Sequence, residues 1–580
     1  MVAEELGVVV EASYEGGFGI VVGSNVDIED IPIGSYILVS SGRYDYLCLV
    51  ADVGYKMPID ESLFRYLSGE YSDMVRRYLS RRIVNYFVRA IPVGRAGPEG
   101  VDKSDTIPSY GSKALIPSQE LLSRFYGRFD WRVNYPLGEP KVIGKVEYSI
   151  PINIRRMIDL NFGIFGKSGS GKTFLGNLIV AYTMLYNKLA RDSDDYIEAR
   201  FLIFDMHNEY SLDVLDDARR RVAGGVFKLF PDDFVVYTPD SRFASEFKMN
   251  LLPIPLYDIS SSLLVYVLEP LGVTRAFLDN LSGFENKLRK FFREKSPFGD
   301  AGYWVLGLIL SKNNIRKFVE LGMEGGSHFI EKNYISQREL GNLVDAIEQD
   351  IADMGQGALQ TFKANRRRLS RLLDMPVSFK KIYKGVMDTV AENLVSRDGR
   401  SVIISMGGYE KNLPVYMAIA NLIGEALWSR LNQPDMEEVE ETNKIIIMLE
   451  EAHKFLGRGV SEYSPFGRIA REMRKKGVVV APIDQKPYEL DPDVLSMIWT
   501  YIVFALTDDR DIDASLTGID RPSLYRNIVA SLRRGEALVY GYGVSFPVVL
   551  KVHDYSRMYR ELVDMARGDG EPSIFDDVPG

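Results

Sequence analysis

The sequence predicts a multi-domain α/β protein with a β-rich N-terminal domain, a core of alternating strands and helices, and a helical insertion within that core. Three observations support this class. Short apolar runs separated by Gly, Asp and Ser turns fill the first part of the chain, strands and helices alternate after it, and residues 258–385 show only helical periodicity. The 580 residues exceed what one hydrophobic core normally holds, so roughly two to four domains are expected.

Composition and periodicity divide the chain into five segments. These are a β-rich domain at 1–135, the two parts of the core at 136–257 and 386–555, the helical insertion at 258–385, and a C-terminal helix with an acidic tail at 556–580. In the first segment the apolar runs recur at roughly ten-residue spacing, which is typical of a β-barrel or sandwich. Residues 60–82 interrupt this pattern with helical spacing.

The overall composition narrows the class of protein. A net charge of -10 argues against a chain that is basic all over, although a local basic patch can still contact nucleic acid. One cysteine, Cys48, excludes an internal disulfide framework and a cysteine-based zinc site. No apolar run reaches the roughly 18 residues of a membrane span, and the acidic N-terminus is a poor secretory signal, so we expect no membrane association and a cytoplasmic location.

Residues 166–173 read GKSGSGKT and fit the pattern G-x-x-x-x-G-K-[ST] of a phosphate-binding loop. Glycines let the backbone turn tightly and point its N–H groups inward, and the start of the next helix adds positive charge there. We expect Lys172 to reach the β- and γ-phosphates of ATP and the Thr173 hydroxyl to complete a Mg²⁺ shell. An apolar strand at 161–165 and an apolar helical run at 174–185 flank the loop, which argues against a chance glycine turn. The expected nucleotide-binding residues are Gly166, Lys167, Ser168, Gly169, Ser170, Gly171, Lys172 and Thr173.

Acidic and polar residues follow two further apolar strands. The strand at 200–204 ends in DMHNEY, and ligands in open α/β sheets bind at the carboxyl ends of strands. The strand at 444–449 ends in Glu450 and Glu451. We expect Glu450 to hold the Mg²⁺ shell and Glu451 to polarise the attacking water as general base. The alternative is a helix-capping acidic pair.

A helix at 467–477 carries arginines on two faces and leads into a strand that is followed by Gln485. A polar residue beside the acidic strand can sense the γ-phosphate. In ring ATPases an arginine of one subunit stabilises transition-state charge in its neighbour's site, and Arg471 or Arg474 is the candidate here. For either arginine, a plain surface salt bridge is the alternative.

The helical insertion carries its own basic cluster. A solvated helix face is the simplest explanation, and contact with DNA phosphate or with a neighbouring subunit are the alternatives. The cluster consists of Lys363, Arg366, Arg367, Arg368 and Arg371.

Four motifs together resemble the HerA family of hexameric DNA-translocating ATPases. They are GKSGSGKT at 166–173, DMHNEY at 205–210, LEEAHKF at 449–455 and IAREMRKKGVVVAPIDQKP at 469–487. The resemblance implies a RecA-like P-loop ATPase core with an N-terminal β-barrel of the HAS-barrel type and a helical-bundle insertion. It also implies a homohexameric ring around double-stranded DNA and cooperation with a NurA-like nuclease in DNA end resection. By motif match the active site includes Asp205, His207 and Glu209, with Gln485 as sensor and Arg471 or Arg474 as the arginine acting in trans.

Several positions depart from the family pattern. Met206 and Asn208 stand where the family usually has Pro and Gly, Met473 replaces a Gly, and the Arg-His before the phosphate loop is missing. These departures suggest a divergent paralogue and weaken the expectation of a NurA partnership more than that of ATP hydrolysis. The leading hypothesis is an ATP-dependent DNA translocase or helicase. The alternatives are a pump ATPase of the type IV secretion or conjugation class, and an ATP-binding ring scaffold for a nuclease or defence effector.

Overall fold

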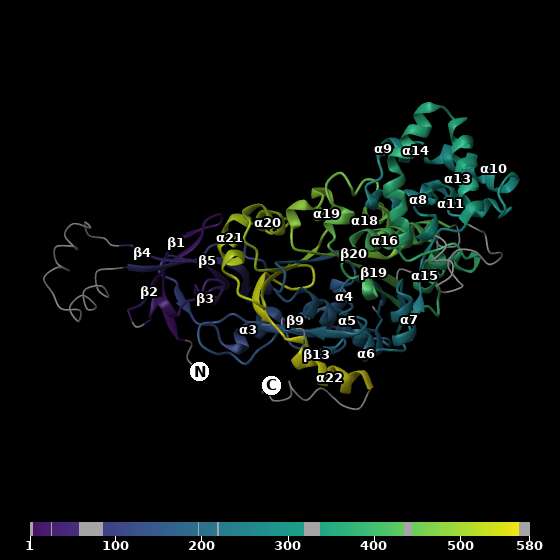
Figure 1. Cartoon of the computed structure of the whole chain (residues 1–580). Helices are drawn as coiled ribbons and strands as arrows, with labels where there is room; N and C mark the ends of the chain where they lie inside the picture. Colours follow the sequence, from purple (N-terminus) through teal and green to yellow (C-terminus); the bar gives the residue numbers. More distant parts are fainter. Residues whose placement is uncertain are drawn as a thin grey trace.

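A computed structural model describes residues 4–24, 26–56, 85–194, 196–216, 218, 220–317, 337–433 and 443–567. Two sequence expectations lie outside these residues: the helical spacing at 60–82 and the acidic tail after residue 567. Among the residues that the structure describes, no helix is long and apolar enough to cross a membrane. Barrel, central sheet and helical insertion follow one another along the long axis of the molecule in Figure 1.

The N-terminal domain is a closed β-barrel. Its strands are β1 (Glu5–Ser13), β2 (Gly17–Val22), β3 (Tyr36–Ser40), β4 (Asp45–Lys56), β5 (Asn85–Gly97), β6 (Gly100–Asp102) and β7 (Lys113–Leu115). The order β2-β1-β7-β3-β4-β5 is closed by pairing of β2 with β5, so only β6 lies outside the ring. Closure removes the free strand edges that would otherwise pair with other chains. Alternate side chains, among them Phe18, Ile37 and Cys48, fill the interior.

The core is one large sheet, twelve-stranded within the described residues. Its parallel strands are β15 (Asn250–Leu251), β14 (Phe234–Thr238), β18 (Ser401–Ser405), β11 (Glu198–Asp205), β19 (Asn443–Glu450), β20 (Val478–Asp484), β10 (Phe162–Phe165) and β21 (Thr500–Phe504), in that spatial order. Antiparallel strands continue it as β22 (Glu536–Gly541), β23 (Val548–Val552), β8 (Asn134–Pro140) and β9 (Ile150–Asn153). The predicted fold class is confirmed: the parallel strands are continuous apolar runs, as expected for a sheet covered on both faces.

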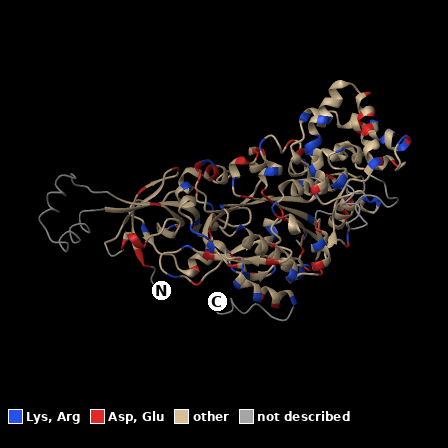
Figure 2. Ribbon diagram, viewed as in Figure 1, with Lys and Arg blue, Asp and Glu red and all other residues tan. Residues whose placement is uncertain are grey.

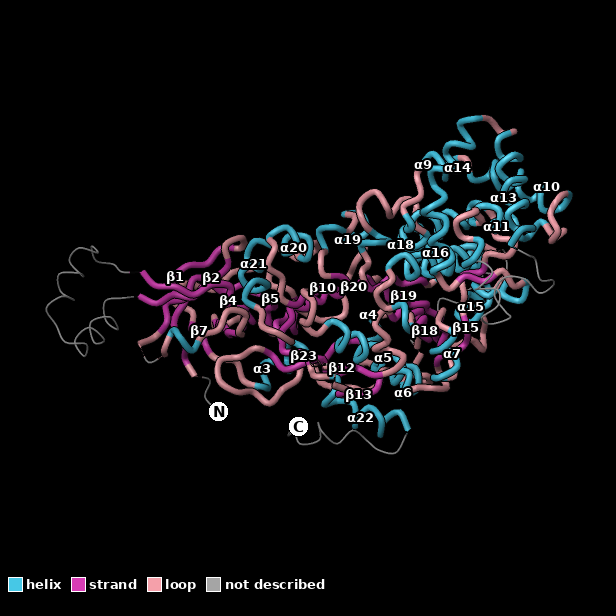
Figure 3. The backbone as a smooth tube through the Cα atoms, in the orientation of Figure 1, coloured by secondary structure: helices cyan, strands magenta, loops and turns pink. Residues whose placement is uncertain are grey.

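Helices cover both faces of this sheet (Figure 3). The main ones are α5 (Lys172–Leu189), α16 (Leu413–Leu431), α18 (Pro465–Glu472) and α22 (Tyr555–Arg567), and α22 packs against α5. The short helix α3 (Gln119–Tyr126) belongs by sequence to the barrel segment, yet its Leu122 and Phe125 are buried in the core shared with the sheet. Charged residues of both signs are distributed over the barrel, the sheet and the insertion within the described residues (Figure 2).

The insertion is a helical bundle. Its helices are α8 (Ser261–Leu268), α9 (Arg275–Asp279), α10 (Leu281–Glu294), α11 (Trp304–Ile309), α13 (Gln337–Ala352) and α14 (Gln356–Leu369). At its base the outgoing and returning chains pair as the short parallel strands β16 (Ile254–Pro255) and β17 (Val377–Ser378). The predicted basic cluster lies on α14 and just after it, where Lys363 and Arg366 both pair with Glu348 of α13. These pairs hold part of the cluster within the bundle.

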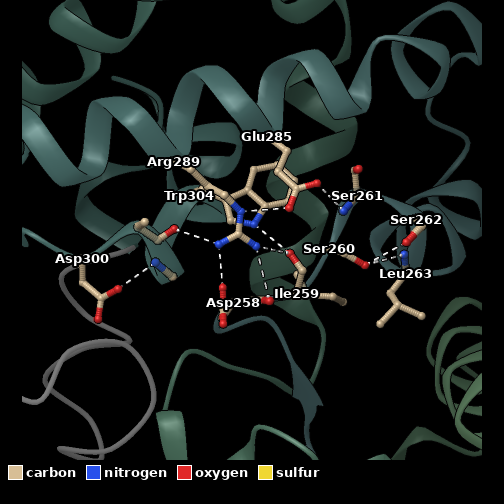
Figure 4. Close-up of polar contacts among 12 residues, drawn as sticks. Asp258, Ile259, Ser260, Ser261, Ser262, Leu263, Glu285, Arg289, Asp300 and Trp304 are labelled. Carbon is tan, nitrogen blue, oxygen red and sulfur yellow. Dashed lines mark hydrogen bonds and ion pairs between the residues drawn. The ribbon is translucent and has the colours of Figure 1, made fainter.

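Arg289 of α10 ties the neck of the insertion together (Figure 4). Its guanidinium donates to Glu285 Oε1 at 2.9 Å and to Asp258 Oδ1 at 2.6 Å. It also donates to the carbonyl oxygen of Ile259 at 3.2 Å, which accepts the indole N–H of Trp304 at 2.8 Å as well. Asp258 has a left-handed backbone with φ 59°, which is uncommon for a residue other than glycine. The hydrogen bonds from Arg289 hold Asp258 in this conformation, at the turn where the chain enters the bundle.

Candidate active site

The phosphate-binding loop joins β10 to α5. Gly166, Gly169 and Gly171 have φ values of 152°, 71° and 116°, in the region where a Cβ causes strain. A Cβ on Gly166 would also lie 2.6 Å from Phe504 Cβ. The Lys172 ammonium donates to the carbonyl oxygens of Gly166 at 2.6 Å and Lys167 at 2.9 Å, so it lies within the curve of the loop. Burial lowers the pKa of Lys172, against the opposing effect of nearby carboxylates.

The loop opens onto a cavity of about 420 Å³ at the carboxyl ends of the parallel strands. Of the predicted site residues, the cavity wall contains Ser168, Gly169, Gly171, Lys172, Thr173, His207, Glu209, Glu450, Glu451 and Gln485. These residues come from four separate stretches of the chain. The parallel sheet therefore brings the phosphate loop and three strand ends to one place, as the sequence predicted.

Asp205 has a different position from the one expected. It is fully buried and is not part of the cavity wall. Its carboxylate accepts hydrogen bonds from the N–H groups of Glu209, Tyr210 and Ser211 at 2.9, 3.2 and 2.8 Å, and from the Ser211 hydroxyl at 2.6 Å. Asp205 thus holds the turn that presents His207 and Glu209, because a carboxylate at the end of a strand can satisfy several consecutive backbone donors.

Asn208 explains one departure from the family pattern. Its φ is 61°, a left-handed conformation that glycine adopts freely and that asparagine tolerates best among the other residues. Its side-chain oxygen accepts hydrogen bonds from the Ser405 hydroxyl and the Gly407 N–H, both at 2.8 Å. Asparagine therefore adopts a left-handed turn that glycine would also allow, and it adds a link to the end of β18. Met473, with φ -90°, needs no glycine at all.

The two acidic residues at the end of β19 have different surroundings: Glu450 is buried, whereas Glu451 contacts Gln485. Glu450 is buried, and its Oε2 has no hydrogen-bond partner among the described residues. Burial and the neighbouring Asp205 and Glu209 raise its pKa well above the ordinary value. Burial and Asp205 also raise the pKa of Glu209 to about 7, opposed by a hydrogen bond with Thr173. An orphaned carboxylate oxygen beside a phosphate loop fits the partial, carboxylate-and-hydroxyl ligand set that Mg²⁺ uses with bound phosphates.

No group of three or more His, Cys, Asp or Glu in the described part of the chain is arranged to hold a metal ion by itself. Mg²⁺ normally keeps several waters and shares its remaining ligands between protein and phosphate, so such a cage is not required. A second orphaned group, the buried Ser170 hydroxyl, lies in the phosphate loop itself. The donor set therefore suits a Mg²⁺–nucleotide complex better than a bare cation.

Glu451 contacts the predicted sensor directly. Its Oε1 accepts a hydrogen bond from Gln485 Nε2 at 2.7 Å, and its backbone is left-handed with φ 50°. A non-glycine residue in this conformation is strained, and strain of this kind clusters at functional sites. Behind it, His453 Nδ1 lies 2.9 Å from Asp484 Oδ2, and this hydrogen bond raises the pKa of His453. The end of β19 is thus fixed to the end of β20 by the Gln485–Glu451 hydrogen bond and by hydrogen bonds from both the ring and the backbone N–H of His453 to Asp484.

The two candidate arginines are in different situations, and neither lines the cavity of its own chain. Arg471 donates to the Ser461 carbonyl at 3.0 Å and hydroxyl at 2.8 Å and pairs with Asp491 at 3.3 Å. Arg474 is exposed, with its guanidinium 5.7 Å from the centre of the Trp499 ring. Arg471 is held within the subunit, whereas Arg474 extends to the surface.

Six residues of the cavity wall were not predicted from the sequence: Phe174, Leu215, Asp216, Glu410, Ile483 and Arg534. Arg534 precedes β22, and the N–H of the next residue, Gly535, donates to the Ser170 carbonyl of the phosphate loop at 3.2 Å. No local pattern indicates this contact, because it depends on β22 joining the sheet two strands from β10. A basic residue just before the hairpin was the only available signal.

Comparison with known proteins supports the HerA resemblance. Residues 137–300 match the family described as "Helicase HerA, central domain". The DNA double-strand break repair helicase HerA of Pyrococcus furiosus is 32% identical over 117 residues, 20% of this chain and 21% of the relative. The protein of the same name from Sulfolobus acidocaldarius is 22% identical over 284 residues, 48% of this chain and 56% of the relative. The matched segments therefore span from about a fifth to just over half of these two relatives.

Among solved structures, the bacterial conjugative coupling protein TrwB aligns with 75% of this chain and 92% of its own, at 12% identity and a TM-score of 0.44. The resemblance to HerA predicted from the motifs is confirmed for the central domain, and it includes the phosphate loop and the DMHNEY turn.

Proposed function

We propose that this chain, whose residues 137–300 match the HerA central domain, is an ATP-dependent DNA translocase or helicase that acts as a homohexameric ring on double-stranded DNA. One observation carries the catalytic part of the proposal. Glu451, held by Gln485 in a strained backbone conformation, lies in the wall of the same cavity as the phosphate loop. A positioned carboxylate opposite a phosphate-binding loop is the arrangement that ATP hydrolysis requires.

The cavity residues have distinct roles in this proposal. The loop N–H groups at 166–173 and Lys172 bind the phosphates of ATP, and Thr173 and Glu450 hold Mg²⁺. Bound Mg²⁺ neutralises phosphate charge. Glu451 accepts the proton of the attacking water, and Gln485 orients the Glu451 carboxylate and responds to the γ-phosphate. Asp205 acts through the turn that it holds rather than by contact with the nucleotide.

Arg474 is the arginine that we assign to the neighbouring subunit's site. Its guanidinium is exposed, whereas Arg471 makes three contacts within its own subunit. A guanidinium brought to a developing negative charge contributes to catalysis without any chemical step of its own. Hydrolysis in one subunit then depends on the presence of the next.

The HerA resemblance is the basis for three further parts of the proposal. These are duplex DNA as the substrate, a NurA-like nuclease as a partner and a role in DNA end resection. The relatives' names describe them as DNA double-strand break repair helicases. Contacts with the phosphate backbone would give binding that depends on salt and not on base sequence.

The experiment is steady-state ATP hydrolysis by wild type and Glu451→Gln, each with and without linear duplex DNA. Loss of a general base is expected to lower the rate by roughly 10²–10⁴-fold. Stimulation by DNA that disappears in the variant supports the proposal. Hydrolysis by wild type that ignores duplex DNA at every salt concentration would contradict the DNA substrate.

A further inference from the structure

A second cavity, of about 370 Å³, lies where the β-barrel meets the core, and it shares no wall residue with the nucleotide cavity. Its wall comes from β5 and β6 of the barrel, from the turn between α20 (Asp509–Ser515) and α21 (Pro522–Ser531), and from the β22–β23 hairpin. The helix α21 packs against β4 of the barrel, as Figure 1 shows. We call this cavity the junction pocket. Cavities of roughly 300–1,000 Å³ are typical of small-molecule sites.

The apolar part of the wall is already packed. The Tyr540 ring stacks on Tyr501, with ring centres 4.9 Å apart. Phe546 makes edge-to-face contacts with Phe125 and Tyr126. These contacts hold both wall rings in place, so a ligand that packs against them has little ordering entropy to overcome. The wall also contains two buried aliphatic residues, Val93 and Val544.

Arg521 is the main polar feature of the junction pocket, and no described carboxylate pairs with it. Its guanidinium donates to the carbonyl oxygens of Tyr14 at 2.9 Å and Pro92 at 3.0 Å. Its Nε is buried and has no hydrogen-bond partner in the described part of the chain. A guanidinium can donate five hydrogen bonds, and a buried N–H without an acceptor costs free energy. Arg521 therefore brings a buried, unused donor and an unpaired positive charge to the wall of the pocket.

Tyr525 provides a second unused polar group. Its side chain is buried in the wall, yet no described residue forms a hydrogen bond with its hydroxyl. Tyr525 follows Arg521 by four residues at the start of α21, a spacing that places two side chains on the same helix face. Burial raises the pKa of Tyr525, and of the charged groups near it Arg521, which lowers this pKa, acts more strongly than Asp520, which raises it. Positive potential therefore prevails at the Tyr525 hydroxyl.

The acidic residues of the wall face solvent. Asp520 forms an ion pair with Lys103, and the side chains of Lys103 and Asp520 are 64% and 48% exposed. Asp102 is exposed and accepts the N–H of Lys103 at 2.7 Å. Water and salt screen exposed charges much more than buried ones. These carboxylates therefore do not compensate Arg521 inside the pocket.

We propose that the junction pocket binds a small organic carboxylate with an aromatic or branched apolar body. The carboxylate accepts hydrogen bonds from Arg521 Nε and from the Tyr525 hydroxyl, and the apolar body packs against Tyr540 and Phe546. Hydrogen bonds between a guanidinium and a carboxylate are roughly twice as strong as neutral ones.

The number of free donors favours a carboxylate over a phosphate. One buried cation and two unused donors match a singly charged head group, whereas a phosphate would bring charge and acceptors that this wall leaves unsatisfied. The bound acid contacts the barrel and the core together, so its binding favours their docked arrangement. This inference goes beyond the proposed ATPase and does not depend on it.

The test uses 4-fluorophenylacetate as the probe and 4-fluorophenylacetamide as its neutral match, each observed by fluorine NMR line broadening with the full chain. ATPγS and Mg²⁺ are present in excess, so that the probe cannot enter the nucleotide cavity. We expect the acid to bind with a Kd of roughly 1 mM, as a ligand of this size does. The amide should bind about tenfold more weakly or worse, because it brings no charge to Arg521.

Two variants test the two donors. Tyr525→Phe keeps the ring in the wall and removes only the hydroxyl, so it should weaken binding of the acid by about tenfold. Arg521→Met should abolish the preference for the acid over the amide. Arg526→Met is the matched control on the same helix, since Arg526 pairs with Asp509 and Asp513 outside the pocket, and it should bind the acid as wild type does.

Four results would overturn the inference. Wild type that broadens neither ligand leaves the pocket to ordered water. Equal affinity for the acid and the amide refutes the anion site. Unchanged affinity for the acid in Tyr525→Phe refutes it as well, and this variant decides the question if Arg521→Met does not fold. Acid binding that is unchanged in both variants places the probe elsewhere on the protein.

Discussion

Gln485→Glu places a second carboxylate against the general base. In the wild type the Gln485 amide donates to Glu451 Oε1 at 2.7 Å, a contact that an ionised carboxylate at position 485 cannot make because it has no proton to donate. In the variant, two carboxylates about 4 Å apart at an effective dielectric constant of about 20 would repel by about 4 kcal/mol if both were ionised. The pair will therefore retain one proton at neutral pH, as closely spaced carboxylates do.

The retained proton has a measurable consequence. About 4 kcal/mol corresponds to about three pH units, so the pH at which the carboxylate pair loses its last proton should move that far in the alkaline direction. Turnover of Gln485→Glu should be strongly reduced at pH 7 and should recover as the pH rises. The assay is a pH–rate profile of ATP hydrolysis at saturating ATP and Mg²⁺.

Gln485→Ala is the matched control, since it removes the same hydrogen bond without adding charge. We expect its turnover to fall by up to about 10²-fold from misplacement of the base, with the acidic limb of the profile unmoved. If the two variants have the same pH–rate profile, Glu451 is not the group that takes the proton, and the assignment of the general base fails.

Three further predictions concern the supports of the site. Asn208→Ala should lower the free energy of unfolding by about 3 kcal/mol, because a left-handed alanine is strained and the Ser405 hydroxyl loses its acceptor; Asn208→Gly should cost less, and equal melting curves for the two variants would contradict this. Arg289→Met should loosen the neck of the insertion, measured as faster hydrogen exchange at residues 254–260, whereas unchanged exchange would show that β16 and β17 suffice. His453→Asn should destabilise the protein more near pH 6 than near pH 9. The pKa of wild-type His453 in the folded state lies above the ordinary value of 6.5, so the contribution of the His453–Asp484 pair to folding stability is complete below pH 6.5 and is lost as the pH rises through the folded-state pKa. A destabilisation independent of pH would contradict this ion pair.

Much of the site was predictable because its signals are local. The phosphate loop depends on glycines at fixed spacing, and the strands that carry Glu450, Glu451 and Gln485 are apolar runs with polar ends. In a parallel sheet, such ends meet at one edge whatever the order of the strands. The prediction therefore needed the type of sheet but not its full topology.

The parts that could not be predicted depend on contacts between distant segments. Nothing around Asp205 distinguishes a carboxylate that holds a turn from one that faces the nucleotide, since both stand at the end of a strand. Arg534 lines the nucleotide cavity only because β22 joins the sheet next to β21. Likewise, β8 and β9 precede the loop in sequence but lie at the far edge of the sheet, beside β23.

The most direct test of the central claim is displacement of a triplex-forming strand from linear duplex DNA, because it detects movement along the duplex itself. Wild type with ATP and Mg²⁺ should release the third strand. Glu451→Gln should bind the DNA without releasing it, and so should wild type with a non-hydrolysable ATP analogue. Wild-type protein that hydrolyses ATP rapidly on the same DNA yet leaves the third strand in place would contradict translocation as the function of this chain.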